Sequence, residues 1–158
     1  MEKYEIVDGI FYLFDEELGI SIKESFEGAV LKEESYYLGE LLHGPSSFYN
    51  KERTLLVRHW FYQGKRHGKG WQYYPSGKLY SIERHFLGKK EGKQEYYYED
   101  GTLKTLVYYK QGVLESQSLL FWPDGKCKRE SRFKEGKRKG WDRVWLENGL
   151  LREENYAE

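Results

Sequence analysis

The stretch GKRHGKGWQYYPSGKLYSIERHFL, residues 64–87, decides the fold because the chain repeats it. Related copies begin at Gly88, Gly112 and Gly136, each 24 residues after the one before. Self-similarity at a fixed period of about 20–50 residues is typical of repeat architectures. We therefore interpret the chain as a series of tandem units.

Glycine marks the same places in each unit. One column holds Gly64, Gly88, Gly112 and Gly136, and a second holds Gly77, Gly101, Gly125 and Gly149. A third column holds Gly68, Gly92 and Gly140, with Ser116 in the remaining place. Glycine recurring at this spacing between runs rich in Tyr, Trp, Phe, Val and Thr indicates strands separated by turns.

A degenerate copy of the repeat precedes residue 64. Gly44, Tyr49 and Leu55 fall in repeat columns, whereas Glu40 and Arg53 replace two of the glycines. Terminal repeats are often atypical because they cap the array. We predict degenerate N-terminal hairpins or a cap at 1–39, followed by five repeats at 40–63, 64–87, 88–111, 112–135 and 136–158.

The second glycine column predicts a three-residue hairpin loop, a type I turn followed by a left-handed glycine. Such a loop pairs the second residue before it with the second residue after it. The pairs are Tyr73 with Leu79, Tyr97 with Leu103, Phe121 with Cys127, and Trp145 with Leu151. Six residues further on, His85, Tyr109 and Phe133 are expected on the same face as this ladder.

We therefore predict an all-β fold, an elongated single-layer antiparallel meander sheet of about ten to twelve strands built from tandem 24-residue β-hairpin repeats. Each hairpin should need its neighbours for stability. Glycine in the left-handed turn position should resist substitution, so Gly101→Val should be more damaging than Gly70→Val, since Gly70 lies off the lattice.

Composition limits the function classes. The net charge is zero and mean hydropathy is −0.87, which fits a thin sheet better than a thick core. The single Cys127 occupies a column otherwise filled by leucine and excludes an internal disulfide. With neither the basic, apolar start of a signal peptide nor 18 consecutive apolar residues, the chain is predicted to be cytoplasmic.

The run GKRHGKGWQYYPSG at 64–77 resembles the MORN repeat (membrane occupation and recognition nexus), an aromatic-rich β-hairpin of about this length. The tandem arrangement, with YYxxGxL motifs, is similar to the variant found in bacterial proteins, which include a family of antitoxins. The Tyr-Glu-Gly-x-Trp opening of eukaryotic units is absent. The resemblance implies a meander sheet and a binding role without catalysis.

The residues predict no catalytic, cofactor or metal site. The Gly64–Lys69 segment has too few residues between its glycines for a phosphate-binding loop, lacks the following Ser or Thr, and would not open a helix. The histidines at 43, 59, 67 and 85 show no spacing typical of metal ligands. No carboxylate pair indicates a catalytic dyad, and a hairpin array offers no deep cleft, so we predict a protein that is not an enzyme.

Two surfaces are candidates for partner binding. One is an aromatic strip, here defined as Tyr74, Tyr98 and Trp122, which a single-layer sheet should leave exposed. The alternative is that strand twist or the N-terminal segment covers these side chains. We predict that this strip binds a protein partner, in one version a toxin that the chain neutralises.

The other surface is a basic rim at the turns of the first glycine column. Its residues are Lys65, Arg66, Lys89, Lys90, Lys137 and Arg138. It belongs to the basic part of the chain, since residues 64–158 hold 20 Lys and Arg against 14 Asp and Glu, whereas residues 1–63 hold 6 against 12. The rim could keep the sheet soluble, or it could bind an acidic partner or an anionic membrane surface. Nucleic acid is the weakest alternative because the whole chain is neutral.

Overall fold

Every regular element in the described part of the chain is a β-strand. The structure is a computed structural model that describes residues 3–7, 10–14 and 19–158. Two strands, β1 (Lys3–Val7) and β2 (Ile10–Phe14), form a separate antiparallel pair. The other fourteen strands within these residues belong to one antiparallel meander sheet, so the predicted all-β fold is confirmed.

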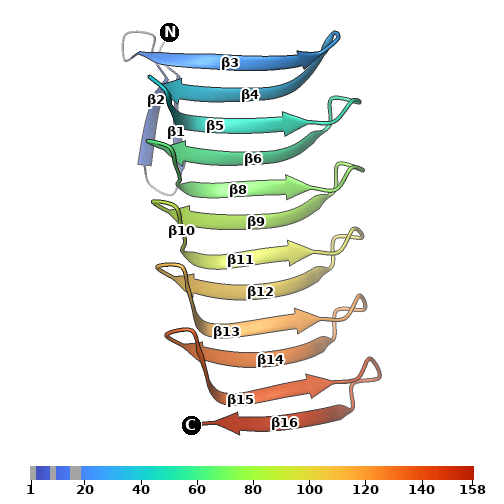
Figure 1. Cartoon of the computed structure of the whole chain (residues 1–158). Coiled ribbons are helices and arrows are strands. Elements are labelled where there is room, and N and C mark those ends of the chain that lie inside the picture. The colour runs from blue at the N-terminus through green and yellow to red at the C-terminus, as the bar shows by residue number, and fades with distance from the viewer. Residues whose placement is uncertain (1–2, 8–9, 15–18) are drawn as a thin grey trace. The chain divides into compact units, whose positions relative to one another are not determined.

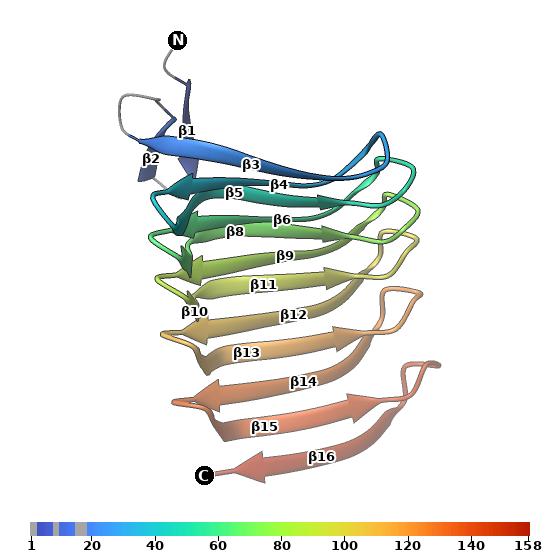
Figure 2. The ribbon, with the colours of Figure 1, turned by 45° about the horizontal axis from the view of Figure 1, so that its top comes forward.

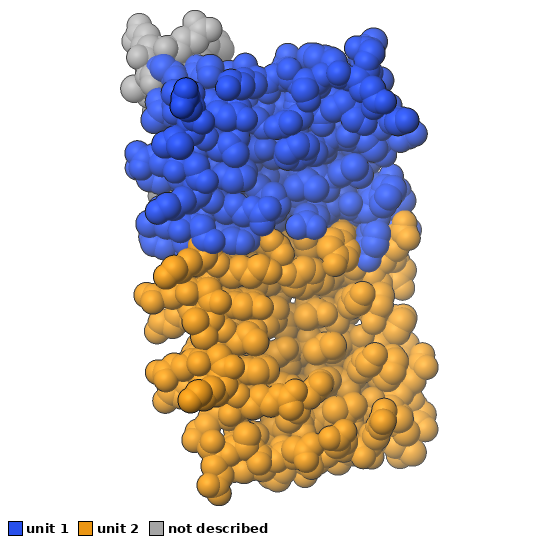
Figure 3. All heavy atoms as spheres, viewed as in Figure 1, with its two compact units in different colours: residues 1–78, 85–88 blue, residues 79–84, 89–158 orange. Residues whose placement is uncertain are grey.

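The chain divides into two compact units, coloured separately in Figure 3. Unit 1 comprises 1–78 and 85–88, and unit 2 comprises 79–84 and 89–158. Besides β1 and β2, unit 1 contains β3 (Ile20–Glu27), β4 (Val30–Leu38), β5 (Leu41–Tyr49), β6 (Leu55–Tyr62), β7 (Lys65–Arg66) and β8 (Gly68–Tyr73). Strand β9 (Leu79–Phe86) contributes residues to both units.

Unit 2 continues the same succession of hairpins. Its strands are β10 (Lys89–Lys90), β11 (Gly92–Tyr97), β12 (Leu103–Lys110), β13 (Val113–Phe121), β14 (Cys127–Lys134), β15 (Lys137–Trp145) and β16 (Leu151–Ala157). Within each unit the two kinds of turn lie on opposite rims (Figures 1 and 2). The strands outnumber the predicted ten to twelve because residues before 40 form regular hairpins and because β7 and β10 are separated from the strands that follow them. The predicted boundary between a cap at 1–39 and five repeats stays a prediction.

The three-residue loops have the predicted geometry. At the loop between β11 and β12, the Gly101 N–H donates to the Tyr98 carbonyl at 2.9 Å, and the Tyr98 N–H donates to the Thr102 carbonyl at 2.8 Å. Gly101 has φ +93°, in the left-handed region that a β-branched residue disfavours. The expected pairs Tyr97–Leu103, Phe121–Cys127 and Trp145–Leu151 are confirmed, while the pairing of Tyr73 with Leu79 stays a prediction.

The turns at the first glycine column are tighter. Gln111 and Gly112 both have positive φ, at 51° and 85°, and the flanking Lys110 and Val113 pair directly. Two consecutive left-handed residues between paired strands define the two-residue type I′ turn, whose twist matches that of a hairpin. The same turn recurs at 63–64, 87–88 and 135–136.

The third glycine column is a β-bulge. Between the pairs Val107–Ser118 and Tyr109–Leu114, β13 advances four residues while β12 advances two. Ser116 has φ +65° there, so a serine occupies the left-handed place that glycine fills in the other repeats. A bulge bends the strand and interrupts the regular pairing.

Irregular pairing also corrects one expectation about the faces of the sheet. Tyr109 was expected on the same face as Leu103, but the register slips between Tyr96 and Tyr97, where Lys104 has no partner. The Lys90 ammonium lies over the rings of both Tyr96 and Tyr109. Because Tyr97 follows Tyr96 and points to the other face, Tyr109 lies opposite the ladder and the expectation is wrong.

The most deeply buried side chains are small or polar. In unit 2 one row of them runs across neighbouring strands and consists of Gln94, Val107, Ser118, Ser131 and Asp142, of which only Ser118 is half-buried. Ser81 and Glu83 of β9 are also buried. The predicted ladder is less covered, since Tyr97 and Leu103 are half-buried. Among the side chains described, the buried apolar core is limited to Trp60 and Val107.

Gly70 has a packing role that its position in the sequence did not indicate. Its φ is not positive, but a Cβ built on it would lie 2.1 Å from Nδ1 of His59, which is itself buried. A Cβ on Gly101 would have nothing within 4 Å. The structure therefore gives Gly70 its own reason to resist substitution, which weighs against the expectation that Gly70→Val would be less damaging than Gly101→Val.

Candidate functional site

The aromatic strip is half-buried, and its members in unit 2 each bridge to the next hairpin. The Tyr98 hydroxyl donates to the Phe121 carbonyl at 2.9 Å, and Nε1 of Trp122 donates to the Trp145 carbonyl at 3.3 Å. Both links span 23 residues. In unit 1, Tyr74 is also half-buried. These rings therefore stabilise adjacent hairpins as well as presenting surface.

Lysines lie over the rings of this strip. Nζ of Lys104 is 5.4 Å from the ring centroid of Tyr98, and Nζ of Lys128 is 4.1 Å from that of Trp122. Such cation–π contacts are worth about 0.5–1 kcal/mol at exposed sites. A partner could displace them at small cost, so the rings stay accessible to a ligand that replaces the ammonium groups.

The last hairpin, β15–β16, exposes more apolar surface than the predicted strip does. Trp141 is 44% exposed and Tyr156 is 60% exposed, and their rings contact each other edge to face at a centroid distance of 5.0 Å. Leu146, in the column of Tyr98 and Trp122, is 40% exposed. Sequence analysis did not select these residues. The available signal was the 24-residue column itself, which continues the aromatic strip to Leu146.

The residues of the basic rim differ in their exposure and in their ion pairing. Lys65, Arg66, Lys89, Lys137 and Arg138 are exposed, and Lys90 is half-buried. The Lys90 ammonium lies 3.2 Å from Oε1 of Glu83 and 3.0 Å from the Tyr96 hydroxyl. Burial alone would lower the pKa of Lys90, but its hydrogen bonds to Tyr96 and Glu83 raise it above the usual value. Lys90 is therefore committed to a contact inside the sheet.

Arg138 is committed in a similar way. Its Nη1 lies 2.7 Å from Oδ2 of Asp142. The two oxygens of that carboxylate also accept two hydrogen bonds from Arg129 and one from Ser131. The hydrogen bond from Arg129 is the main reason that the pKa of Asp142 falls to about 2. Of the basic rim, Lys65, Lys89 and Lys137 are the members best placed to meet an anionic ligand.

A column of hydrogen-bond acceptors, missed from the sequence, holds successive turns together. The side chains of His43, His67, Glu91 and Glu115 each accept from the backbone N–H of a turn residue 20 positions later. Their 24-residue spacing was visible in the sequence. Burial lowers the pKa of His43, which favours the neutral imidazole that accepts from the Gln63 N–H. This column has a structural role.

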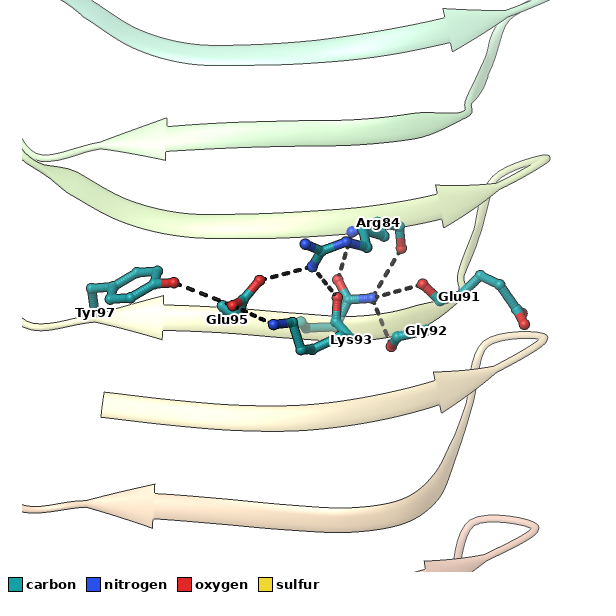
Figure 4. Close-up of polar contacts among 7 residues, drawn as sticks. Arg84, Glu91, Gly92, Lys93, Glu95 and Tyr97 are labelled. Atoms are coloured by element: carbon teal, nitrogen blue, oxygen red, sulfur yellow. Dashed lines mark hydrogen bonds and ion pairs between the residues drawn. The ribbon is translucent and has the colours of Figure 1, made fainter. Parts of the chain in front are cut away.

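A second polar network surrounds Gln94, whose side chain is fully buried. Figure 4 shows polar contacts among its neighbours Arg84, Lys93 and Glu95. Oε1 of Gln94 accepts from the Arg84 N–H at 2.9 Å, and its Nε2 donates to the Arg84 carbonyl at 3.0 Å. The Arg84 guanidinium contacts Glu95 at 2.9 Å, and Lys93 contacts the same carboxylate at 2.8 Å. Burial would raise the pKa of Glu95, but its hydrogen bonds to Lys93 and Arg84 lower it.

These networks have the electrostatics of structural ion pairs. A general acid at neutral pH needs a carboxyl pKa raised toward 7, whereas Glu95 and Asp142 are shifted downward. Burial raises the pKa of the half-buried Cys127 thiol, which disfavours the reactive thiolate. In the described residues, no three His, Cys, Asp or Glu side chains converge as metal ligands.

No protein-family model matches the sequence, and no curated protein matches it. A search of the described residues for a helix long and apolar enough to cross a membrane finds none.

Proposed function

We propose that the protein is a non-catalytic protein-interaction module of the MORN-like hairpin-repeat type, which binds a protein partner in the cytoplasm. The observation that carries the proposal is the set of apolar side chains at the surface of unit 2, where Trp141, Leu146 and Tyr156 are exposed and the rings of Tyr98 and Trp122 are half-buried. Tyr and Trp dominate the energetics of protein interfaces because they combine large apolar area with a polar tip.

The ion-paired carboxylates support a binding role over catalysis. Glu95 and Asp142 have charge partners within the fold, and their pKa values are lowered. Both features favour permanent ionisation and a fixed position. A toxin is one specific form of the protein partner, as the resemblance to bacterial antitoxins implies.

An anionic membrane surface is the second candidate ligand, and the exposed Lys65, Lys89 and Lys137 favour it. The two proposals differ in their dependence on salt. Charge-driven binding to anionic lipid weakens steeply as salt is added, because the Debye length falls to about 8 Å at 0.15 M. Docking of apolar and aromatic side chains tolerates salt better.

The test compares two variants against the partner captured from the native cell. One carries Tyr74→Ala, Tyr98→Ala and Trp122→Ala, and the other carries Lys65→Glu and Lys137→Glu. Both variants are first checked for retained folding by circular dichroism, because Tyr98 and Trp122 also bridge hairpins. We expect the aromatic variant to lose the partner and the charge variant to keep it. Loss of binding in the charge variant alone would refute the proposal.

A further inference from the structure

A groove in unit 2 lies beside the bulge between β14 and β15. Its volume is about 630 Å³, and it is lined by Glu115, Ser116, Gln117, Arg132, Phe133, Lys134, Lys139, Gly140 and Tyr156. Between the pairs Ser131–Asp142 and Phe133–Arg138, β15 advances four residues while β14 advances two. The extra residues of β15 include Lys139 and Gly140, which line the groove.

The groove carries an excess of positive charge. Arg132, Lys134 and Lys139 are all exposed, and none forms an ion pair with the residues that the structure describes. The one carboxylate of the lining, Glu115, is half-buried and accepts the Glu135 N–H at 2.7 Å. The Glu115 carboxylate therefore already accepts a hydrogen bond that stabilises the turn at residue 135.

Comparison of the repeats shows that Arg132 has lost the partner that its equivalent possesses. Arg84, two repeats earlier, is neutralised by Glu95 at 2.9 Å. The position equivalent to Glu95 near Arg132 is occupied by Arg143, which is paired with Glu154 instead. The positive charge of Arg132 therefore has no counterpart in the fold, unlike the charge of Arg84.

Lys139 is a second departure from the repeat pattern. Its column otherwise holds hydrogen-bond acceptors, namely His43, His67, Glu91 and Glu115, each of which caps a later turn. An ammonium group only donates, so Lys139 cannot cap a backbone N–H. Two positions that serve the fold in earlier repeats thus present cations at this groove.

An aromatic side chain completes the surface. Tyr156 lies in the lining and is 60% exposed. Cations together with an aromatic side chain fit an acidic ligand that also carries apolar groups. A bare phosphate is disfavoured because phosphate sites typically use a helix N-terminus or a nest of backbone N–H groups, and the groove is formed by strands.

We propose that this groove binds an extended acidic peptide segment of the partner protein, with carboxylates at Arg132 and Lys139 and an apolar or aromatic side chain against Tyr156. This inference rests on the proposed function, because it assigns the chemistry of the partner. The groove shares Tyr156 with the apolar surface of unit 2, but Arg132 and Lys139 belong to the groove alone, so variants at these two residues test the groove separately.

The experiment measures fluorescence polarisation of a labelled glutamate-rich peptide that contains two phenylalanines, mixed with the full chain. The test variant is Arg132→Glu with Lys139→Glu. The control is Lys78→Glu with Lys126→Glu, which makes the same charge change at exposed residues that directly follow three-residue loops. We expect the groove variant to weaken binding at least about tenfold and the control to change it less than about twofold. A matched peptide with glutamine in place of glutamate should not bind.

Equal losses in both variants would show non-specific charge attraction and would overturn the inference. Unchanged binding by the groove variant, or equal binding of the glutamine peptide, would also overturn it. Binding to phosphatidylserine vesicles or inorganic phosphate without binding to the peptide would assign the groove to another ligand. Circular dichroism melts of both variants exclude unfolding as the cause of a loss. Capture of the cellular partner by the wild-type chain, measured separately, keeps a failure of the proposed function distinct from a failure of the groove.

Discussion

Replacing Asp142 with asparagine should remove the most strongly held carboxylate that the structure describes. The side chain is buried and receives hydrogen bonds from Nε and Nη2 of Arg129 at 2.9 and 2.7 Å, and from the Ser131 hydroxyl at 2.6 Å. Arg138 adds an ion pair at 2.7 Å. Asparagine keeps the size of the side chain but leaves two guanidinium groups without a charged partner.

The magnitude follows from the pKa of Asp142. The hydrogen bond from Arg129, with smaller contributions from Ser131 and Arg138, lowers the pKa from 3.8 to about 2. At about 1.4 kcal/mol per pH unit, the native state gains roughly 2 kcal/mol from the charged form. Because the folded-state pKa is depressed, this stability is present above about pH 4 and is lost as pH falls toward 2.

The assay is urea unfolding of the wild type and of Asp142→Asn at neutral pH and at several values between about 5 and 2. We expect the variant to lose about 2–4 kcal/mol at neutral pH, since removing one partner of a buried pair leaves the other uncompensated. Its stability should also fall less on acidification. The control is Glu154→Gln, which breaks the more exposed pair with Arg143 and should cost under about 1 kcal/mol. An acid dependence identical in Asp142→Asn and wild type would refute the reasoning.

Three further predictions concern single positions and one pair. Gly70→Val should destabilise the fold at least as much as Gly101→Val. A Cβ at Gly70 meets a buried imidazole at 2.1 Å, whereas Gly101 is limited by its φ of +93°. Thermal melts that show Gly70→Val to be well tolerated would contradict this. Tyr97→Ala and Leu103→Ala should each lower the free energy of unfolding by about 1–3 kcal/mol, and their effects should not add in the double mutant. The two residues pair across strands and are half-buried. Additive effects would indicate that the two side chains do not contact each other. His43→Gln should reduce the loss of stability on acidification below about pH 6.5. Burial depresses the folded-state pKa of His43, so the neutral imidazole contributes stability above that pH and the contribution is lost below it. Urea unfolding of both proteins on either side of this pH tests the prediction.

The turns were predictable from the sequence because they depend on local geometry. Asp100 followed by Gly101 favours a type I turn with a left-handed final residue, and the Asp100 carboxylate accepts the Thr102 N–H at 2.8 Å in the structure. Glycine at fixed spacing also predicted the period of the hairpins. The predicted pair Tyr97–Leu103 followed directly from the length of that loop.

The faces of the sheet were not predictable in the same way. Side chains alternate only while pairing stays regular, and a bulge changes the face of every residue beyond it. The slip between Tyr96 and Tyr97 therefore moved Tyr109 to the other side. The glycine pattern did not indicate the bulge at Ser116, because serine replaces glycine there. The φ of +65° at Ser116 shows that the backbone conformation is the same as in the other repeats.

The candidate site was predictable only in part. The aromatic column was visible, but the hydrogen bonds from Tyr98 and Trp122 to carbonyls 23 residues later depend on tertiary geometry. The unpaired charge of Arg132 is clear only beside the Arg84–Glu95 pair, because it depends on which side chain lies across the neighbouring strand. Charge counts along the sequence cannot supply that comparison.

Site-specific photo-crosslinking in the native cell tests the central claim, that the apolar surface of unit 2 binds a protein. A benzophenone amino acid is placed at Tyr156 or Leu146, both exposed in β15–β16 and its adjoining loop, and as a control at the exposed Lys51 of unit 1. We predict a discrete adduct with one protein from the unit 2 positions and none from the control, followed by mass spectrometry of the adduct. Adducts from the control alone, or with lipid in place of protein, would contradict the account.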